Sequence, residues 1–194
     1  MEKQVPATAV LQFNKNIFKP TTRTDAMMES AKQQEEFFKS VRDVEKDKQL
    51  KWDLRFLELA KLISTWSKDP STQTGAVIVD KNNRVISVGY NGFAKSVKDT
   101  DERYNNRELK YKIIVHCERN AIIFAQKNLE GCTLYTYPFM SCSTCASMVI
   151  NAGITRCVAP PVPEDKRVRW EEDMKLSAEL FKEAGVAVDI VEFK

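Results

Sequence analysis

The chain has 194 residues, 43% of them hydrophobic and 29% charged, which is enough for one well-cored domain with an appendage. Its 30 Lys and Arg residues nearly balance 27 Asp and Glu residues, and a net charge of only +3 argues against a dedicated binder of nucleic acids or membrane surfaces. No run approaches the ~18 consecutive apolar residues of a membrane span, and the N-terminal residues lack the apolar core of a secretory signal, so we expect a cytoplasmic protein.

Residues 1–50 differ in character from the rest of the chain. About the first half of this segment is irregular, and a polar, helix-prone stretch with scattered Met and Phe residues follows it. We expect an arm or helix that packs on the body of the protein or on a neighbouring subunit. The chain is therefore predicted to divide into an N-terminal extension, residues 1–50, and a second domain, residues 51–194.

From residue 51 onward the sequence predicts a regular alternation of elements. A helix over residues 52–67 leads to two β-branched runs, 74–80 and 84–91, which form a hairpin signal. The alternation that follows demands parallel strands with crossover helices. The predicted fold is α/β, a three-layer α/β/α sandwich with a five-stranded mixed sheet. Its remaining helices and strands are expected over residues 116–128, 132–137, 142–153, 154–159, 167–185 and 186–193.

The single histidine of the chain, His116, belongs to a pattern that indicates metal chemistry. Glu118 follows it at an expected helix start, and Cys142 and Cys145 open another helix. One imidazole and two thiolates form a three-ligand catalytic zinc set that leaves a position for water. Residues i and i+3 in the first turn of a helix lie close together, and the helix N-terminus favours thiolates. The sequence thus predicts Zn²⁺ as cofactor, held by His116, Cys142 and Cys145.

Three other interpretations of this pattern are weaker. A redox pair is the commonest rival explanation of C-x-x-C, but such a pair is expected without an H-x-E motif, and this chain has one. A structural zinc site needs a fourth protein ligand, for which Cys117 is the nearby residue. A non-catalytic nucleotide sensor would not need the complete set that is present here. Since the five cysteines are an odd number without a signal peptide, we expect Cys132 and Cys157 to be buried thiols rather than disulfides.

H-x-E followed by C-x-x-C is nearly the signature of zinc deaminases. The chain resembles the cytidine/deoxycytidylate deaminase superfamily, and it is most similar to the deoxycytidylate (dCMP) deaminase branch. The similarity extends from Trp52 to Ile190, roughly 70% of the sequence. It rests on four collinear motifs: SKDPSTQTGAVIVD, GYNGF, HCERNAI and CSTCASMVINAGI.

Three positions depart from the pattern of that branch. Ser141 replaces the usual Pro before the first cysteine, Cys117 replaces the usual Ala, and Ala94 stands where Pro is frequent. None of these changes removes a ligand or Glu118. They bear instead on the exact substrate and on nucleotide regulation, because the GYNG segment resembles the effector-binding part of the branch.

The resemblance implies a hydrolase that converts dCMP to dUMP and ammonia in pyrimidine deoxynucleotide metabolism. Zinc would lower the pKa of a bound water to about 7, and Glu118 would carry protons to N3 of cytosine and to the leaving ammonia. Alternatives are deaminases of cytidine, guanine, tRNA adenosine or a riboflavin precursor. A tRNA reader would need a more basic surface.

The substrate-binding residues are less sharply predicted. Asn91 in the GYNG turn resembles the sugar-contacting Asn of the family, although a plain turn residue is the alternative. The backbone N–H of Cys117 would, by the same resemblance, hold the pyrimidine O2. We expect Asn120 to support the site without contacting the substrate, since a polar side chain within an otherwise apolar helix needs a partner. The charged run 95–112 predicts either a solvated face or a lid that grips the 5′-phosphate, and the loop 67–73 is a second phosphate candidate. The side chains considered are Arg103, Arg107, Lys110 and Lys112 in the run, and Ser67, Lys68, Thr72 and Gln73 in the loop.

Small deaminases of this kind complete their sites from neighbouring subunits. The resemblance therefore implies a homo-oligomer. The expected ligand is a small-molecule nucleotide, and we expect neither a membrane nor a nucleic acid as a partner.

Overall fold

The computed structural model describes residues 23–193, with side chains from residue 27 onward. The chain divides into two units, Met1–Lys46 and Asp47–Lys194, and the second contains every motif discussed above. The expected organisation, an N-terminal extension over residues 1–50 and a zinc-dependent deaminase domain over residues 51–194, remains a prediction. Within the described residues, no helix is both long enough and apolar enough to cross a bilayer.

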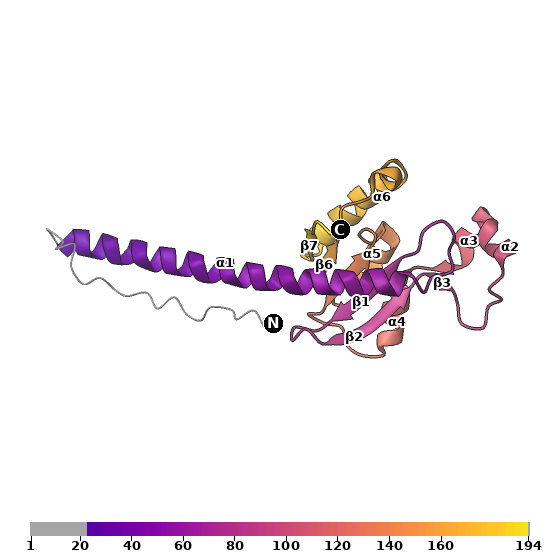
Figure 1. Ribbon diagram of the computed structural model, residues 1–194, viewed down its shortest axis with the longest axis horizontal. Helices are drawn as coiled ribbons and strands as arrows, with labels where there is room; N and C mark the ends of the chain where they lie inside the picture. The colour runs from indigo at the N-terminus through magenta and orange to yellow at the C-terminus, as the bar shows by residue number, and fades with distance from the viewer. Residues whose placement is uncertain (1–22, 194) are drawn as a thin grey trace, which may run out of the picture. The chain divides into compact units, whose positions relative to one another are not determined.

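Helix α1, Arg23–Ser64, is one continuous element (Figure 1). The sequence predicted its second half from apolar periodicity and its first half only as a helix-prone stretch. In the second unit, α1 buries Phe56, Leu57, Ala60 and Ile63, which share one side of the helix because Ala60 lies four residues after Phe56 and three residues from both Leu57 and Ile63. In the first unit the large apolar side chains of α1 are exposed: Met27, Met28, Phe37, Phe38, Val41 and Val44.

The predicted five-stranded mixed sheet is confirmed. Its strand order is β2-β1-β5-β6-β7. The strand β1 pairs antiparallel with β2 and β5, whereas β6 pairs parallel with β5 and β7. The hairpin therefore supplies the antiparallel part, and the crossover helices supply the parallel part. The strands are β1 (Gly75–Val79), β2 (Val85–Tyr90), β5 (Thr133–Tyr137), β6 (Arg156–Ala159) and β7 (Ala187–Ile190).

Helices cover both faces of this sheet, which confirms the three-layer sandwich. Alternate residues of β1 point to opposite faces: Val77 and Val79 join the apolar cluster of α1, whereas Ala76 and Ile78 join the cluster of the other helices. That second cluster is formed with α4 (Cys117–Ala125), α5 (Ser143–Asn151) and α6 (Glu164–Glu183).

Close packing of α4 on the sheet depends on one glycine. A Cβ at Gly89 in β2 would collide with the backbone of Cys117 and Ala121 in α4. Only a residue without a side chain lets the helix approach this closely. The first turn of α4, which carries the H-x-E motif, is thereby fixed against the sheet.

The charged run before His116 folds into a small substructure beside the main sheet. Its two strands pair antiparallel, and buried Tyr104 stacks on Phe93 with ring centroids 4.4 Å apart. The side chain of Asn106 caps the second helix by accepting a hydrogen bond from the backbone N–H of Leu109. The elements are β3 (Gly92–Phe93), α2 (Asp101–Asn105), α3 (Arg107–Ile113) and β4 (Ile114–Val115).

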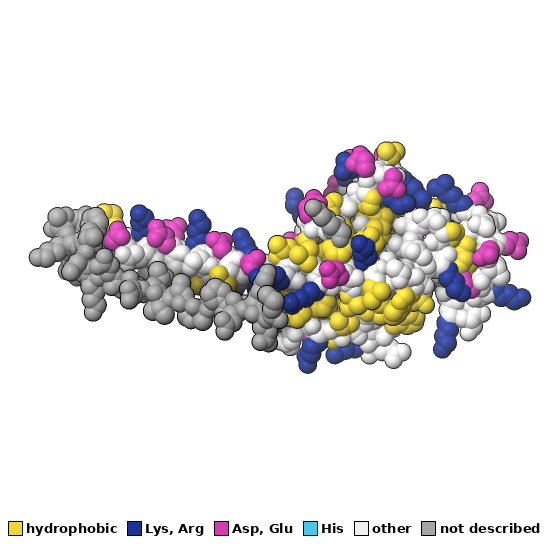
Figure 2. All heavy atoms as spheres, viewed as in Figure 1, with side chains coloured by type: hydrophobic (Ala, Val, Ile, Leu, Met, Phe, Trp, Pro, Cys, Tyr) yellow, Lys and Arg dark blue, Asp and Glu magenta, His cyan; other side chains and the backbone are white. Residues whose placement is uncertain are grey.

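Charges of both signs are interspersed on the second unit. On the face drawn in Figure 2, Lys and Arg side chains lie among Asp and Glu side chains without a large patch of either sign. This distribution agrees with the small net charge of +3.

Candidate active site

Three side chains that could hold a metal ion converge where two helices begin. His116 immediately precedes α4, Cys142 immediately precedes α5, and Cys145 lies in the first turn of α5. His116 Nδ1 lies 3.4 Å from the Sγ atoms of both Cys142 and Cys145, and the ligand atoms all lie within 4.8 Å of one another. Bonds of about 2.1 Å to nitrogen and 2.3 Å to sulfur place tetrahedral zinc ligands about 3.5–3.8 Å apart, so this donor set fits zinc with one position left open.

The protonation states of these three side chains favour the binding of a metal cation. A hydrogen bond from Cys145, and a second from His116, lower the pKa of Cys142 to about 5 although burial opposes the change. The hydrogen bond with Cys142 raises the pKa of Cys145 and likewise that of His116. Cys142 is therefore a thiolate at neutral pH, as its place at a helix N-terminus also favours. A metal ion would replace the proton that Cys145 holds.

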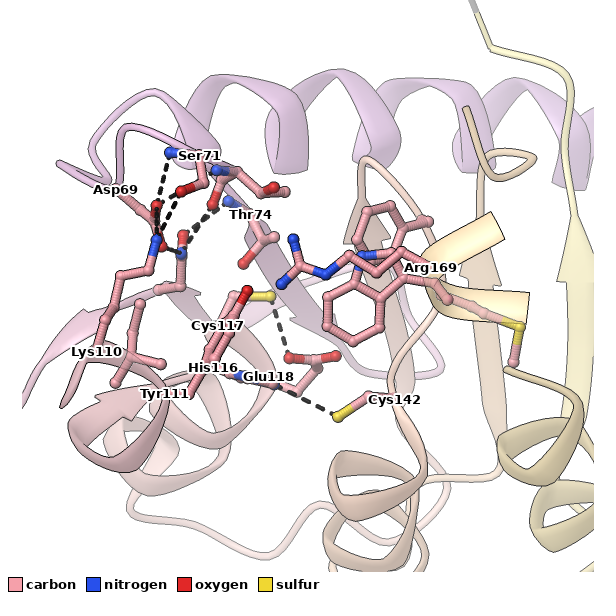
Figure 3. Close-up of a pocket in the computed structure, with 16 residues that line it drawn as sticks. Asp69, Ser71, Thr74, Lys110, Tyr111, His116, Cys117, Glu118, Cys142 and Arg169 are labelled. Atoms are coloured by element: carbon pink, nitrogen blue, oxygen red, sulfur yellow. Dashed lines mark hydrogen bonds and ion pairs between the residues drawn. The ribbon is translucent and has the colours of Figure 1, made fainter. Parts of the chain in front are cut away.

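Glu118 is a buried carboxylate beside these ligands (Figure 3). Its Oε2 accepts a hydrogen bond from the thiol of Cys117 at 3.2 Å. Burial raises the pKa of Cys117 well above its usual value, so this thiol keeps its proton, and Cys117 lies outside the group of converging ligand atoms. In the described part of the chain Glu118 forms no ion pair, which leaves its second oxygen available for proton transfer.

His116, Cys142 and Glu118 line the inner end of a pocket that opens to solvent. The pocket lies between α4 and α5 on one side and the α2–α3 substructure, the loop after α1 and α6 on the others. Its lining comprises Asp69, Ser71, Thr72, Thr74, Asn91, Lys110, Tyr111, Ile114, His116, Cys117, Glu118, Phe139, Met140, Cys142, Arg169 and Trp170.

Asn91 lies in this lining, but its amide is bonded to the loop after α1. The Asn91 side chain accepts a hydrogen bond from the backbone N–H of Thr74 at 2.7 Å and donates one to the carbonyl of Thr72 at 2.9 Å. A longer contact of 3.4 Å reaches the carboxylate of Asp69. Asn91 therefore shapes the wall of the pocket by fixing this loop.

The four basic residues of the charged run differ in their environments. Lys110 is buried, and its Nζ donates to Asp69 at 2.9 Å and to the hydroxyl of Ser71 at 2.7 Å. Arg107 is exposed and lies over the ring of Tyr111. Of the four, only Lys110 is part of the pocket lining, and Arg103 donates to the backbone carbonyl of Lys98.

The second group of phosphate candidates is mostly engaged elsewhere. Lys68 pairs with Asp99 at 2.6 Å, while Ser67 and Gln73 hydrogen-bond to nearby backbone carbonyls. Only Thr72 of this group lines the pocket.

Two pocket residues, Arg169 and Trp170, come from α6 and were missed by the sequence analysis. The sequence predicts a helix over residues 167–185 but contains no motif that connects this helix with the site. Figure 3 shows the Arg169 side chain reaching into the pocket. Trp170 packs on Phe139, and its indole N–H is buried with no acceptor among the described residues.

Asn120 lies outside the pocket lining and connects two elements next to the site. Its Nδ2 donates to the backbone carbonyl of Tyr90 at 2.8 Å and so ties α4 to the end of β2. The expected buried thiols, Cys132 and Cys157, are each 5% exposed in the core.

Comparison with protein families agrees with this geometry. A family model described as the "Cytidine and deoxycytidylate deaminase zinc-binding region" matches residues 50–160, more than half of the chain. The chain belongs to this family. The predicted family membership, the zinc cofactor and the class of zinc-dependent hydrolytic deaminase are thereby confirmed.

Individual members of the deaminase family show how far the similarity extends. An uncharacterized deaminase in the luxG 3′ region of Aliivibrio fischeri is 45% identical over 138 residues, covering 71% of this chain and 92% of that protein. The deoxycytidylate deaminase of Mus musculus is 35% identical over 149 residues, covering 73% and 80% of the two chains. A probable deoxycytidylate deaminase of Caenorhabditis elegans is 44% identical over 111 residues, covering 55% and 56%.

Solved structures confirm the deaminase fold. The apo dCMP deaminase of cyanophage S-TIM5 superposes with a TM-score of 0.56 over 72% of this chain and 96% of that chain, at 19% identity. The complex of that enzyme with dCMP and dUMP gives a TM-score of 0.55.

Proposed function

We propose that this enzyme hydrolyses dCMP to dUMP and ammonia. The observation that carries the proposal is one pocket that is lined by Glu118 and by His116 and Cys142 of the metal-binding cluster at its inner end, with the cationic side chains of Lys110 and Arg169 near its mouth. The relatives in mouse and nematode, which are named deoxycytidylate deaminases, support the same substrate. The base of dCMP suits the inner end, and its phosphate suits the cationic mouth.

His116, Cys142 and Cys145 would hold the zinc ion, which supplies the Lewis acidity that activates water near neutral pH. Glu118 takes a proton from the attacking water and delivers it to N3 of the ring while the C4–O bond forms. Glu118 then transfers the second proton to the departing amino group as the C4–N bond breaks. One water is consumed and one ammonia is released.

The backbone N–H of Cys117 would donate to O2 of the base from the first turn of α4. The thiol of Cys117 keeps Glu118 in place through its hydrogen bond to Oε2. Asn91 would contribute through the loop that it fixes, with its side chain beside the sugar.

Ammonia release from a substrate panel tests the proposal. The panel contains dCMP, CMP, dCTP, deoxycytidine, cytidine, cytosine, guanine and adenosine, each assayed with the zinc-loaded enzyme. We expect dCMP to have the highest kcat/KM. Values for deoxycytidine and dCMP that agree within about threefold would contradict the proposal, because two charge-assisted phosphate hydrogen bonds imply a factor of ~10² or more.

We also propose that the enzyme is a cytoplasmic homo-oligomer. The exposed Met and Phe side chains of α1 support self-association, since burial of such large apolar side chains against a second chain would be favourable. All five cysteines are free thiols, as is usual in a reducing compartment. Light scattering at micromolar concentration should give a mass of at least two chains; a fully active monomer would refute the oligomer.

A further inference from the structure

The pocket continues past Lys110 into a second hollow, which we call the outer hollow. It shares Ser71, Lys110, Tyr111 and Arg169 with the pocket and adds Arg107 on its far side. No acidic side chain of the described chain lines it. A ligand that fills the pocket can therefore extend into a space bounded by three cations.

Only two of these three cations are available to a ligand. Lys110 is buried and already bonded to Asp69 and Ser71. In the described part of the chain Arg107 and Arg169 form no ion pair, and both are exposed. The two guanidinium groups are therefore the anion-binding candidates.

The two arginines share an aromatic platform. The guanidinium of Arg107 lies 5.5 Å and that of Arg169 lies 5.2 Å from the centroid of the Tyr111 ring, and Arg169 also lies 5.1 Å from that of Trp170. Stacking of this kind restrains an arginine while leaving its N–H donors free. Burial and the nearby charge of Arg107 lower the pKa of Arg169. An anion between two such like charges would stabilise both.

Helix α6 is anchored to the metal-binding end of the pocket, so Arg169 is held in register with it. One helical turn after Arg169, the carboxylate of Asp173 accepts hydrogen bonds from the backbone N–H of Ser143 at 3.0 Å and from its hydroxyl at 2.6 Å. One turn further, the hydroxyl of Ser177 donates to the carbonyl of Ser141 at 2.7 Å. Residues at i, i+4 and i+8 lie on one helix face, and this face of α6 meets the segment that carries Cys142.

We propose that Arg169 and Arg107 clamp the 5′-phosphate of the substrate over Tyr111, and that Arg169 determines the preference for a nucleotide over a nucleoside. The inference rests on the proposed deamination of a cytosine nucleotide at the same site. Planar guanidinium groups suit phosphate oxygens because they donate paired hydrogen bonds. In this arrangement Lys110 is a positioning residue, which fixes the loop that carries Asp69 and Ser71.

Kinetics of matched variants test the clamp. We expect Arg169→Ala to lower kcat/KM for dCMP by about 10- to 100-fold, mainly through KM, and to change kcat/KM for deoxycytidine by less than about twofold. Arg169→Lys should recover part of the loss, and Arg107→Ala should act in the same direction. The control is Arg167→Ala, which removes an arginine of the same helix that pairs with Glu164 outside the pocket. Unchanged nucleotide preference in Arg169→Ala would overturn the inference.

Equilibrium binding separates this inference from the proposed function. Calorimetry on the zinc-loaded protein compares dUMP, deoxyuridine and inorganic phosphate without any turnover. The clamp predicts that dUMP binds at least about tenfold more tightly than deoxyuridine and that Arg169→Ala removes the difference. If the wild-type enzyme turns over no cytosine nucleotide yet phosphate binding depends on Arg169, the proposed function fails and the clamp stands. Equal binding of dUMP to the wild type and to the Arg107→Ala/Arg169→Ala double variant would refute the clamp.

Discussion

The inner end and the mouth of the pocket are built in opposite ways. At the inner end, two short motifs supply His116, Glu118, Cys142 and Cys145, all of them buried or half-buried at the starts of two helices. At the mouth, cations from α3 and α6 meet across an exposed tyrosine. The chemistry thus depends on local helix geometry, whereas the recognition of the substrate depends on how distant elements pack.

The two ends also differ in charge. Thiolate and carboxylate groups gather at the inner end and favour a metal cation, while guanidinium groups gather at the mouth and favour an anion. A ligand with a neutral base and an anionic tail has only one favourable orientation in such a pocket. Variants at the inner end should therefore affect all substrates equally, and variants at the mouth should affect nucleotides selectively.

Removal of a zinc ligand should have the largest effect. Cys142→Ala or Cys145→Ala should lose bound zinc and reduce turnover of dCMP and deoxycytidine alike to background, since two ligands hold a catalytic ion poorly. Metal analysis and ammonia assays measure both outcomes. The control, Cys132→Ala, removes a buried core thiol and should retain about one zinc per chain. Full zinc occupancy in a double variant at positions 142 and 145 would refute the ligand assignment.

Glu118→Gln should have the next largest effect. It preserves the shape of the side chain but cannot accept a proton, so kcat should fall by ~10²–10⁴ for nucleotide and nucleoside alike while zinc content and Tm stay near wild type. Exposed Glu130→Gln serves as the control. If Glu118→Gln retained more than about a tenth of the wild-type kcat, Glu118 would not be the proton carrier.

Lys110→Met sharpens the comparison between the two ends of the pocket because it removes a cation near the mouth but leaves Arg107 and Arg169 unchanged. Its ion pair with Asp69 is buried, and removing one partner should lower the free energy of unfolding by about 3 kcal/mol. The loss of stability should be no larger than this because the backbone N–H groups of Ser71 and Thr72 still donate hydrogen bonds to Asp69. Thermal or urea unfolding measures the stability. The kcat/KM values for dCMP and deoxycytidine should fall by similar factors; a selective loss for dCMP would make Lys110 a phosphate ligand.

The smallest effect is expected for a variant that weakens contacts with the sheet beneath the inner end and the mouth of the pocket. Burial alone would raise the pKa of Asp53, but hydrogen bonds from Arg156, Gln49 and Tyr135 outweigh it and hold this pKa below its usual value. A depressed pKa contributes stability that is present above the unfolded value, about 3.9, and is lost as pH falls through the folded value. Asp53→Asn should therefore destabilise the protein at pH 7, and the difference from wild type should shrink as the pH falls below about 4. Urea unfolding across this range would contradict the assignment if the difference were constant.

The order of helices and strands in the second unit was predictable, because each element carries its own apolar period and ends at a turn residue. The α2–α3 substructure was not. Its sequence is highly charged, and its short helices are held by contacts such as the stacking of Tyr104 on Phe93 rather than by an apolar stripe. The continuity of α1 was also missed, since its first half is polar and shows no clear period.

By itself, the sequence determined which residues bind zinc and carry protons in our proposal, because H-x-E and C-x-x-C place side chains together within single helical turns. Only the tertiary structure showed which of the basic side chains are available to bind an anion. Lys110 appeared equivalent to Arg107 in the sequence, yet it is bonded to Asp69, 41 residues earlier in the chain. Arg169 had no motif and reaches the pocket because Asp173 and Ser177 dock α6 beside Cys142. The free energy of an ion pair or a docked helix depends on groups far apart in the chain, and no local spacing records which of them will meet.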